Sequence, residues 1–320
     1  MARHITARYI VTLALFYLLE LLTPVVSAAQ SPVIVVLYPE LEEPYRGVFS
    51  SIIEGIQEES KVGVMLLSLG DGPDITQLEK SVNLSGVSVI IALGRTGRAA
   101  AEHWRGKIPI VVGALLLTPD KTERGLAGIS LAADPNLLLE RLTHLAPSVK
   151  RVHVVYSPRS SGWLIQIARN SANKFNFQLR AYKSDDIKSS ALIYRDILNK
   201  SRPGEDAIWL LPDPVAVDNK ITFPLLLRGA WNDSVLLFSS NPALVKRGVL
   251  FAMFPDNRLM GMSLARMAES YLGDDIAGMR NTVVPLKDLQ AAINVRTADH
   301  IGLTLSNEER KDYALIFPAP

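Results

Sequence analysis

The stretch Val33-Ile34-Val35-Val36-Leu37-Tyr38 decides the fold class. Its length is that of a strand, and its continuous apolar character, without alternation, is typical of a strand that is covered on both faces. Apolar residues then recur at the spacing of a helix face at Val48, Phe49, Ile52, Ile53 and Ile56. A buried strand followed by an amphipathic helix predicts the first unit of an α/β fold with a parallel sheet.

The same pattern continues along the chain and then starts again. Further strands are expected at 62–69, 87–93 and 108–113, with a helix over 96–104 between the last two. The stretch Gly128-Ile129-Ser130-Leu131 is expected to lead into a second series. There, helices are expected over 135–145, 163–175 and 187–199, and strands over 152–156, 178–182, 207–211 and 235–239. The sequence therefore predicts an α/β protein with two Rossmann-like lobes.

The composition excludes several classes of protein. The 320 residues include 48% apolar residues, 34 Lys plus Arg, 32 Asp plus Glu and no cysteine, and the formal net charge is +2. This composition excludes a disordered chain. The missing cysteine excludes disulfides, thiol nucleophiles and zinc ribbons. Because a nucleic-acid-binding surface normally gives a large basic excess, we expect no nucleic-acid partner.

Residues 1–29 are expected to form an export signal. They comprise a basic start at Arg3 and Arg8, an apolar run over 9–22, Pro24, and the small-residue stretch Val26-Ser27-Ala28-Ala29. The alternative is a retained membrane anchor, but the run is short of the ~20 apolar residues of a span and contains Glu20. Cleavage after Ala28 or Ala29 would release a soluble periplasmic protein, which cannot be a lipoprotein because it has no cysteine.

The sequence offers little support for catalysis. No G-x-S-x-G motif is present, and the serines that follow the strand ending at Tyr156 have no base nearby in the sequence. His153 lies within that strand, and the remaining histidines are isolated at His103, His144 and His300. We therefore expect no enzyme, no metal site and no cofactor.

Polar residues gather at the expected carboxyl ends of the strands. In parallel sheets these ends share one edge, and ligands bind beyond it. The candidate ligand-binding residues of the first lobe are Tyr38, Gly94, Arg95 and Thr96, and those of later segments are Tyr156, Ser157, Asp213, Asp218, Asn219, Ser240, Asn241 and Asp256. We expect Thr96, Ser157, Asp213 and Asn241 to contact the ligand. For any single residue a turn or helix cap is the alternative, as for Asp218 before a helix, and Arg95 could favour an anionic ligand or face solvent.

The end of the chain resembles a known family. The stretch Ile293-Asn294-Val295-Arg296-Thr297-Ala298-Asp299-His300-Ile301-Gly302-Leu303-Thr304-Leu305-Ser306 resembles the ending of ABC-transporter substrate-binding proteins whose better-known members bind tryptophan or tyrosine. Supporting motifs are Asp256 with Gly261 and Arg266-Met267-Ala268, Gly128-Ile129-Ser130, and Val154-Val155-Tyr156-Ser157-Pro158. The chain departs from the family at Asn257-Arg258, where the family has two tyrosines, and at Pro212-Asp213-Pro214.

The resemblance implies the type I periplasmic binding protein fold, in which three crossovers join two lobes. The N-terminal lobe would comprise 30–131 plus 252–283, because the chain would return to it at the strand over 249–254 and the helix over 259–272. The C-terminal lobe would comprise 132–251 plus 284–320.

The resemblance also implies a function. The protein would be a monomeric, non-enzymatic solute-binding component of an ABC uptake transporter, with lobes that close on a small ligand, an amino acid or related small organic molecule. The closed form would dock transiently on a permease in the inner membrane. The alternative is a sensory or regulatory protein of the same fold, which would present its bound form to a signalling receptor.

Overall fold

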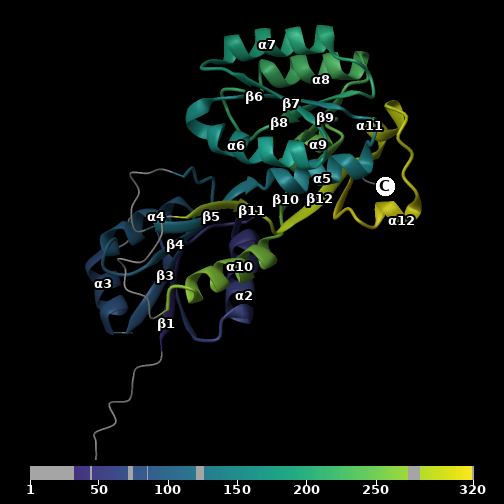
Figure 1. Cartoon of the computed structure of the whole chain (residues 1–320). Helices are drawn as coiled ribbons and strands as arrows, with labels where there is room; N and C mark the ends of the chain where they lie inside the picture. The colour runs from purple at the N-terminus through teal and green to yellow at the C-terminus, as the bar shows by residue number, and fades with distance from the viewer. Residues whose placement is uncertain are drawn as a thin grey trace, which may run out of the picture. The chain divides into compact units, whose positions relative to one another are not determined.

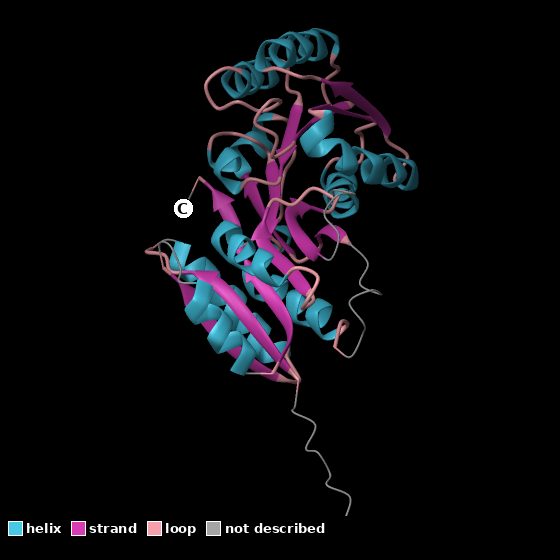
Figure 2. Ribbon diagram, turned by 90° about the vertical axis from the view of Figure 1, so that its left-hand side faces the viewer, coloured by secondary structure: helices cyan, strands magenta, loops and turns pink. Residues whose placement is uncertain are grey.

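The computed structural model describes residues 32–43, 45–70, 75–84, 86–119, 126–272 and 282–318. The expected export signal at 1–29 lies outside these residues. The described chain forms two sheets with helices on their faces (Figure 1; Figure 2). In these ranges, no helix combines the length and the apolar character that crossing a bilayer requires.

The first sheet is entirely parallel. Its strands, in the order β11-β5-β4-β3-β1-β2, are β1 (Val33–Pro39), β2 (Gly63–Leu69), β3 (Val87–Leu93), β4 (Ile110–Leu115), β5 (Leu126–Ala133) and β11 (Val283–Leu286). Ile34 and Val36 of β1 belong to one hydrophobic cluster, and Val35 and Leu37 belong to another. The strand is buried on both faces, which confirms the prediction from its continuous apolar run.

The helices of the first lobe are α2 (Tyr45–Glu59), α3 (Ile75–Leu84), α4 (Gly94–Ala101), the 3-10 turn η1 (Glu102–Trp104) and α10 (Asn257–Glu269). Helices α2 and α10 lie side by side (Figure 1). A Cβ atom on Gly55 would lie 2.0 Å from the carbonyl oxygen of Arg258, and one on Gly261 would lie 2.0 Å from that of Ile52. The two backbones therefore touch at a crossing that only glycine permits.

The second sheet has the strand order β13-β12-β10-β9-β8-β6-β7. Its strands are β6 (Arg151–Tyr156), β7 (Gln178–Lys183), β8 (Asp206–Leu210), β9 (Leu236–Ser239), β10 (Phe251–Pro255), β12 (Leu289–Asn294) and β13 (Leu315–Phe317). All strand pairs are parallel except β10 with β12. Its helices are α5 (Pro135–Leu145), α6 (Pro158–Lys174), α7 (Ile187–Lys200), α8 (Thr222–Asn232), α9 (Pro242–Lys246), α11 (Val295–His300) and α12 (Asn307–Arg310).

The chain passes between the two sheets three times, after β5, after β10 and after β11. The predicted α/β fold class, with two lobes of mostly parallel sheet, is confirmed. The second passage differs from the expectation, because β10 pairs with β9 and β12 in the second sheet. The return to the first lobe therefore begins with α10, after residue 255, and not with the strand that the prediction assigned to the first lobe from residue 252.

Candidate ligand-binding site

The carboxyl end of β1 opens into a cavity of about 260 Å³. Its wall comprises the end of β1, the loop after it, the start of α2 and one residue of β2, namely Tyr38, Pro39, Glu40, Leu41, Arg46, Phe49, Ser50, Ile53 and Ser68. Tyr38 was predicted to belong to the site. The cavity lies at the carboxyl edge of the sheet, the edge at which open parallel sheets bind ligands.

The cavity combines opposite charges with aromatic surface. Glu40 and Arg46 are both exposed, and neither forms an ion pair with any side chain in the described ranges. Arg46 Nε donates a hydrogen bond to the carbonyl oxygen of Leu41 over 3.2 Å, which leaves its other guanidinium nitrogens available. Half-buried Tyr38 and Phe49 supply the aromatic surface. The prediction missed Glu40, Arg46 and Phe49, although Glu40 directly follows the buried strand β1 and offered the same signal as the polar residues that were chosen.

Gly94, the first residue of α4, packs against Phe49 of the cavity wall. Gly94 has a φ of +69°, and a Cβ atom there would lie 3.2 Å from Phe49 Cζ. Gly97 brings α4 against β1, since a Cβ atom there would lie 2.5 Å from the carbonyl oxygen of Leu37. The predicted residues Arg95, which is exposed, and Thr96, which is half-buried, follow in the first turn of α4. The structure thus brings the four predicted first-lobe residues to one edge of the sheet.

Asp213 organises the corresponding edge of the second sheet, and its carboxylate is only 2% exposed. Its oxygens accept hydrogen bonds from Ser157 N at 2.8 Å, Ser160 Oγ at 3.1 Å, Ser161 Oγ at 2.8 Å, Val215 N at 3.1 Å and Ala216 N at 3.4 Å. These bonds fasten the start of α6 to the loop after β8. We expected Asp213 to contact the ligand, but its burial and its internal donors point to a positioning role instead.

The remaining residues at the start of α6 differ in exposure. Ser157 is the N-cap residue of α6, yet its hydroxyl makes no cap hydrogen bond to the helix. Its side chain is half-buried, so this hydroxyl remains a candidate ligand contact. Tyr156 is 6% exposed and belongs to the hydrophobic core of the lobe. Its ring is therefore a core element rather than an open aromatic wall.

Most of the other predicted residues have local structural roles. Asp218 accepts hydrogen bonds from the backbone of Lys220 and Ile221 ahead of α8, at 2.9 and 2.7 Å. Asn241 caps α9 and Asp256 caps α10. Asn219 accepts a hydrogen bond from Arg247 Nη1 over 3.2 Å, and Ser240 is half-buried after β9. For Asp218, Asn241 and Asp256, the turn or cap role that the sequence left open as the alternative is the one observed.

Large exposed apolar side chains gather on the segments that follow the carboxyl ends of the strands. Six of the nine such residues in the described chain follow β1, β4, β8 or β10, namely Leu41, Tyr45, Val48, Leu116, Ile221 and Leu259. Tyr45 is the most exposed of them, at 64%.

A buried charged network lies at the opposite, amino ends of β6 and β8. Arg151 forms two hydrogen bonds with Asp206, both of 2.7 Å, and His153 Nε2 lies 2.8 Å from Asp206 Oδ1. Burial acts to raise the pKa of Asp206, but the hydrogen bonds from Arg151, the Arg202 backbone and His153 outweigh it, so the pKa lies well below its usual value. Burial lowers the pKa of His153, against the opposing effect of Asp206. This network has the character of a hydrogen-bonded core element, distant along the strands from the candidate site.

Comparison with known families identifies the chain. Residues 25–312 match the family model described as ABC transporter substrate binding protein. The chain belongs to this family. It is therefore the substrate-binding component of an ABC transporter, and the family consists of non-enzymatic binding proteins.

Three solved structures share the fold over most of both chains. A ligand-free, open substrate-binding protein with adhesive properties from Clostridium difficile has a TM-score of 0.60 at 15% identity, covering 88% of this chain and 98% of its own. An ABC domain in complex with L-Trp from Streptococcus pneumonia has a TM-score of 0.50 at 17% identity, covering 89% and 100%. A conserved domain protein from Vibrio cholerae has a TM-score of 0.52 at 17% identity, covering 89% and 99%.

At these identities the similarities establish the fold alone. That fold is the type I periplasmic binding protein fold, as the sequence predicted. Comparison with curated protein sequences gives no match.

Proposed function

We propose that this substrate-binding protein takes up an amino acid or a related small organic molecule between the carboxyl edges of its two sheets. The observation that carries this proposal is the cavity at the end of β1, where Glu40 and Arg46 stand beside Tyr38 and Phe49. A carboxylate suits a ligand ammonium group, a guanidinium suits a ligand carboxylate, and aromatic rings suit an apolar side chain.

The second lobe would contribute the start of α6. This helix has 17 residues, so its N-terminus carries a positive partial charge that favours an anionic group. Asp213 holds Ser157 at this N-terminus, where the Ser157 hydroxyl would meet the ligand. Because one protein of similar fold is in complex with L-Trp, an aromatic amino acid is the first ligand to test.

The export signal predicted at 1–29 supports a periplasmic location for this function. Binding would stabilise the closed arrangement of the lobes, because a ligand that contacts both lobes has its higher affinity for that arrangement. The closed monomer would then dock transiently on the permease in the inner membrane. The exposed apolar residues after β1, β4, β8 and β10 are candidates for that contact.

Thermal unfolding with added ligands tests the proposal. A ligand at 100 times its Kd stabilises the protein by about 2.7 kcal/mol, so a true ligand gives a clearly higher melting temperature than the protein alone. The compounds to compare are L-tryptophan, L-tyrosine, L-leucine, L-glutamate and ribose. We expect at least one amino acid to raise the melting temperature, and Arg46→Met to reduce that rise to about half, as a tenfold weaker affinity requires at the same ligand concentration. Arg169→Met, which changes an exposed arginine on α6, is the matched control. A rise with ribose alone, or an equal rise in Arg46→Met, would contradict the proposal.

A further inference from the structure

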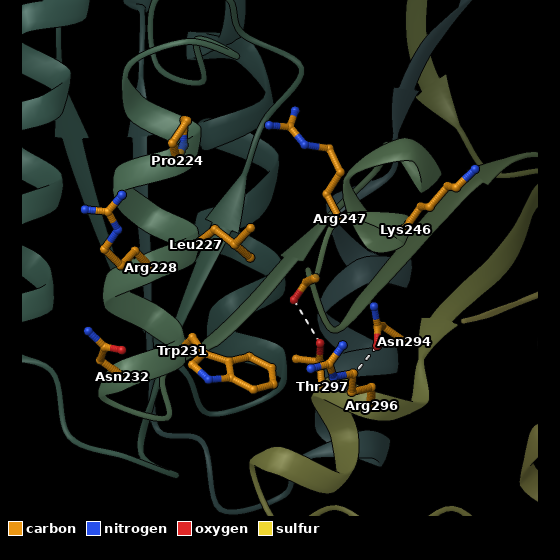
Figure 3. A pocket seen from close by; sticks show the side chains of 11 residues that line it. Pro224, Leu227, Arg228, Trp231, Asn232, Lys246, Arg247, Asn294, Arg296 and Thr297 are labelled. Atoms are coloured by element: carbon orange, nitrogen blue, oxygen red, sulfur yellow. Dashed lines mark hydrogen bonds between the residues drawn. The ribbon is translucent and has the colours of Figure 1, made fainter. Parts of the chain in front are cut away.

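A second cavity, of about 490 Å³, lies in the second lobe between α8, the end of α9 and the start of α11 (Figure 3). Its wall includes Pro224 and Leu227 of α8, Gly248 after α9, and Asn294 at the end of β12. Asn294 lies beside the start of β10, because β12 runs antiparallel to β10. The cavity therefore extends toward the amino ends of β9 and β10, and it is distinct from the candidate site at their carboxyl ends.

Buried hydrogen bonds fix the walls of this cavity. Asn294 is 7% exposed, and its Nδ2 donates to the carbonyl oxygen of Val245 over 2.8 Å while its Oδ1 accepts from Thr297 N over 3.0 Å. Thr297 Oγ1 donates to the carbonyl oxygen of Gly248 over 3.0 Å. Gly248 has a φ of +121°, and a Cβ atom there would lie 2.8 Å from Leu227 Cδ1. The turn after α9 is thus tied to α11 and packed closely against α8.

Four cationic side chains line the cavity, and no acidic side chain of the described residues does: Arg228, Lys246, Arg247 and Arg296. In Figure 3 the side chains of Arg228 and Lys246 extend outward at its rim. Within the described ranges none of the four forms an ion pair. Arg247 is held over the Phe223 ring at 4.2 Å, and the Arg296 guanidinium lies 5.9 Å from the centre of the Trp231 ring. The net charge of the whole chain is only +2, so these four cationic groups, none of them in an ion pair, give the cavity a locally positive potential.

Trp231 adds a fixed apolar platform. Its ring stacks on His300 with 3.7 Å between ring centres, and His300 Nε2 lies 2.8 Å from the carbonyl oxygen of Trp231. The side chain nevertheless remains 37% exposed and lines the cavity. An exposed tryptophan with a fixed ring, beside several arginines, is typical of residues that dominate the energy of binding.

We propose that this cavity binds a small organic anion, in which a carboxylate, sulfate or phosphate group is attached to a flat apolar body. The anionic group would lie among Arg228, Arg247 and Arg296, and the apolar body would lie against Trp231 and Leu227. The volume is that of a small-molecule site, and the walls are fixed by buried groups, which favours a small ligand over an acidic protein segment. This binding would be independent of the transported ligand.

Fluorescence titration of the full chain with 1-anilinonaphthalene-8-sulfonate, an aromatic sulfonate, tests the proposal. We expect saturable binding at one site, weakened about tenfold in Arg296→Met and in Arg228→Met, because each arginine supplies a charge-assisted contact. Trp231→Leu should weaken it by a similar factor. Uncharged N-phenyl-1-naphthylamine should bind about tenfold more weakly than the sulfonate.

Two matched controls make the test decisive. Arg169→Met changes an exposed arginine on α6, and Arg46→Met changes the cavity at β1, so neither should alter the affinity for the sulfonate. Circular dichroism confirms that each variant is folded. Unchanged affinity in both Arg228→Met and Arg296→Met would overturn the proposal, as would a loss confined to Arg46→Met. Tighter binding of a hexaglutamate peptide than of the sulfonate would also overturn it, in favour of an acidic protein partner.

Discussion

The two lobes share one architecture but differ in what their interiors contain. Among the described residues, the buried aspartate and histidine side chains, Asp134, His153, Asp206 and Asp213, all belong to the second lobe, with Asp134 capping α5 at its entrance. In the described part of the first lobe the buried polar side chain is Ser130, which bonds to the backbone of Leu117. The second lobe fixes the carboxyl edge of its sheet with the buried carboxylate of Asp213. The first lobe fixes α2, which carries Arg46 and Phe49, through contact between helix backbones.

This difference separates residues that hold the site from residues that would touch the ligand. A buried carboxylate with five donors cannot also serve a ligand, whereas an exposed carboxylate with no ion pair can. Asp213 is the first kind and Glu40 is the second. Variants of Asp213 should therefore lose stability, whereas variants of Glu40 should lose affinity for the ligand.

The largest effect should come from Asp213→Ala. The substitution leaves the donors of Ser157, Ser160 and Ser161 buried or half-buried without their acceptor, which should cost about 3–5 kcal/mol of the free energy of unfolding. We expect a melting temperature lower by on the order of 10 °C. Asp213→Asn keeps one acceptor and should cost less. A stable Asp213→Ala protein with weakened ligand binding would show that Asp213 contacts the ligand after all.

Gly261→Ala should be the next most damaging change. Its Cβ atom would lie 2.0 Å from the carbonyl oxygen of Ile52, so α10 and α2 must separate, at a cost of about 2–3 kcal/mol. Gly162→Ala in α6 is the matched control, because a Cβ atom there has no neighbour within 4 Å. That change should raise stability by about 0.5–1 kcal/mol through helix propensity. Urea unfolding of both variants measures the contrast, and equal effects would show that the glycine crossing is not tight.

Glu40→Gln and Arg46→Met should leave the melting temperature of the unliganded protein unchanged, because both side chains are exposed. Each should weaken the binding of an amino-acid ligand by about tenfold, since each removes one charge-assisted contact. Calorimetric titration measures the change. An unaltered Kd in both variants would place the ligand elsewhere on the sheet edge.

The smallest effect should be a pH dependence of the stability of the second lobe. Burial lowers the pKa of His153 in the folded chain, so its contribution to stability is present above about pH 6.5 and is lost as the pH falls below that value. The lowered pKa of Asp206 acts in the same direction, at more acidic pH. We therefore compare amide hydrogen-exchange rates, corrected for intrinsic rates, at pH 7.5 and pH 5.5. As the pH falls, the corrected rates in β6 and β8 should rise more than those in β1 and β3. His153→Gln should reduce that difference, and an unchanged difference would assign it to another group.

The fold was largely predictable because continuous apolar runs mark strands that are buried on both faces. The expected strand over 87–93 and helix over 135–145 have the observed bounds of β3 and α5. For helix α8 the sequence predicted only a start after Asp218 and no bounds, since its stretch Thr222-Phe223-Pro224-Leu225-Leu226-Leu227 is apolar on several sides and contains a proline. The sheet to which β10 belongs could not be read from its sequence either, because pairing depends on partners that are distant along the chain.

The site was predictable as an edge of the sheets but not residue by residue. A polar residue after a strand can face a ligand, cap a helix or turn inward, and the sequence pattern is the same in each case. Asp213 turns inward because serines and backbone amides around it supply donors, three of them more than 50 residues away along the chain. Glu40 and Arg46 were missed because a short loop and the first turn of a helix bring them beside Tyr38.

The crossing of α2 and α10 has a consequence for biosynthesis. Helix α10, which covers Ile52, Gly55 and Ile56 of α2, is synthesised about 200 residues after them. In contrast, β6 to β10 of the second lobe form one unbroken segment of the chain. A nascent chain that ends before residue 257 can therefore complete most of the second sheet but leaves α2 uncovered. Such long-range contacts delay folding. The first lobe should stay sensitive to protease in chains stopped at residue 255 and become resistant only when α10 and β11 have been added, so the part synthesised first is among the last to finish folding.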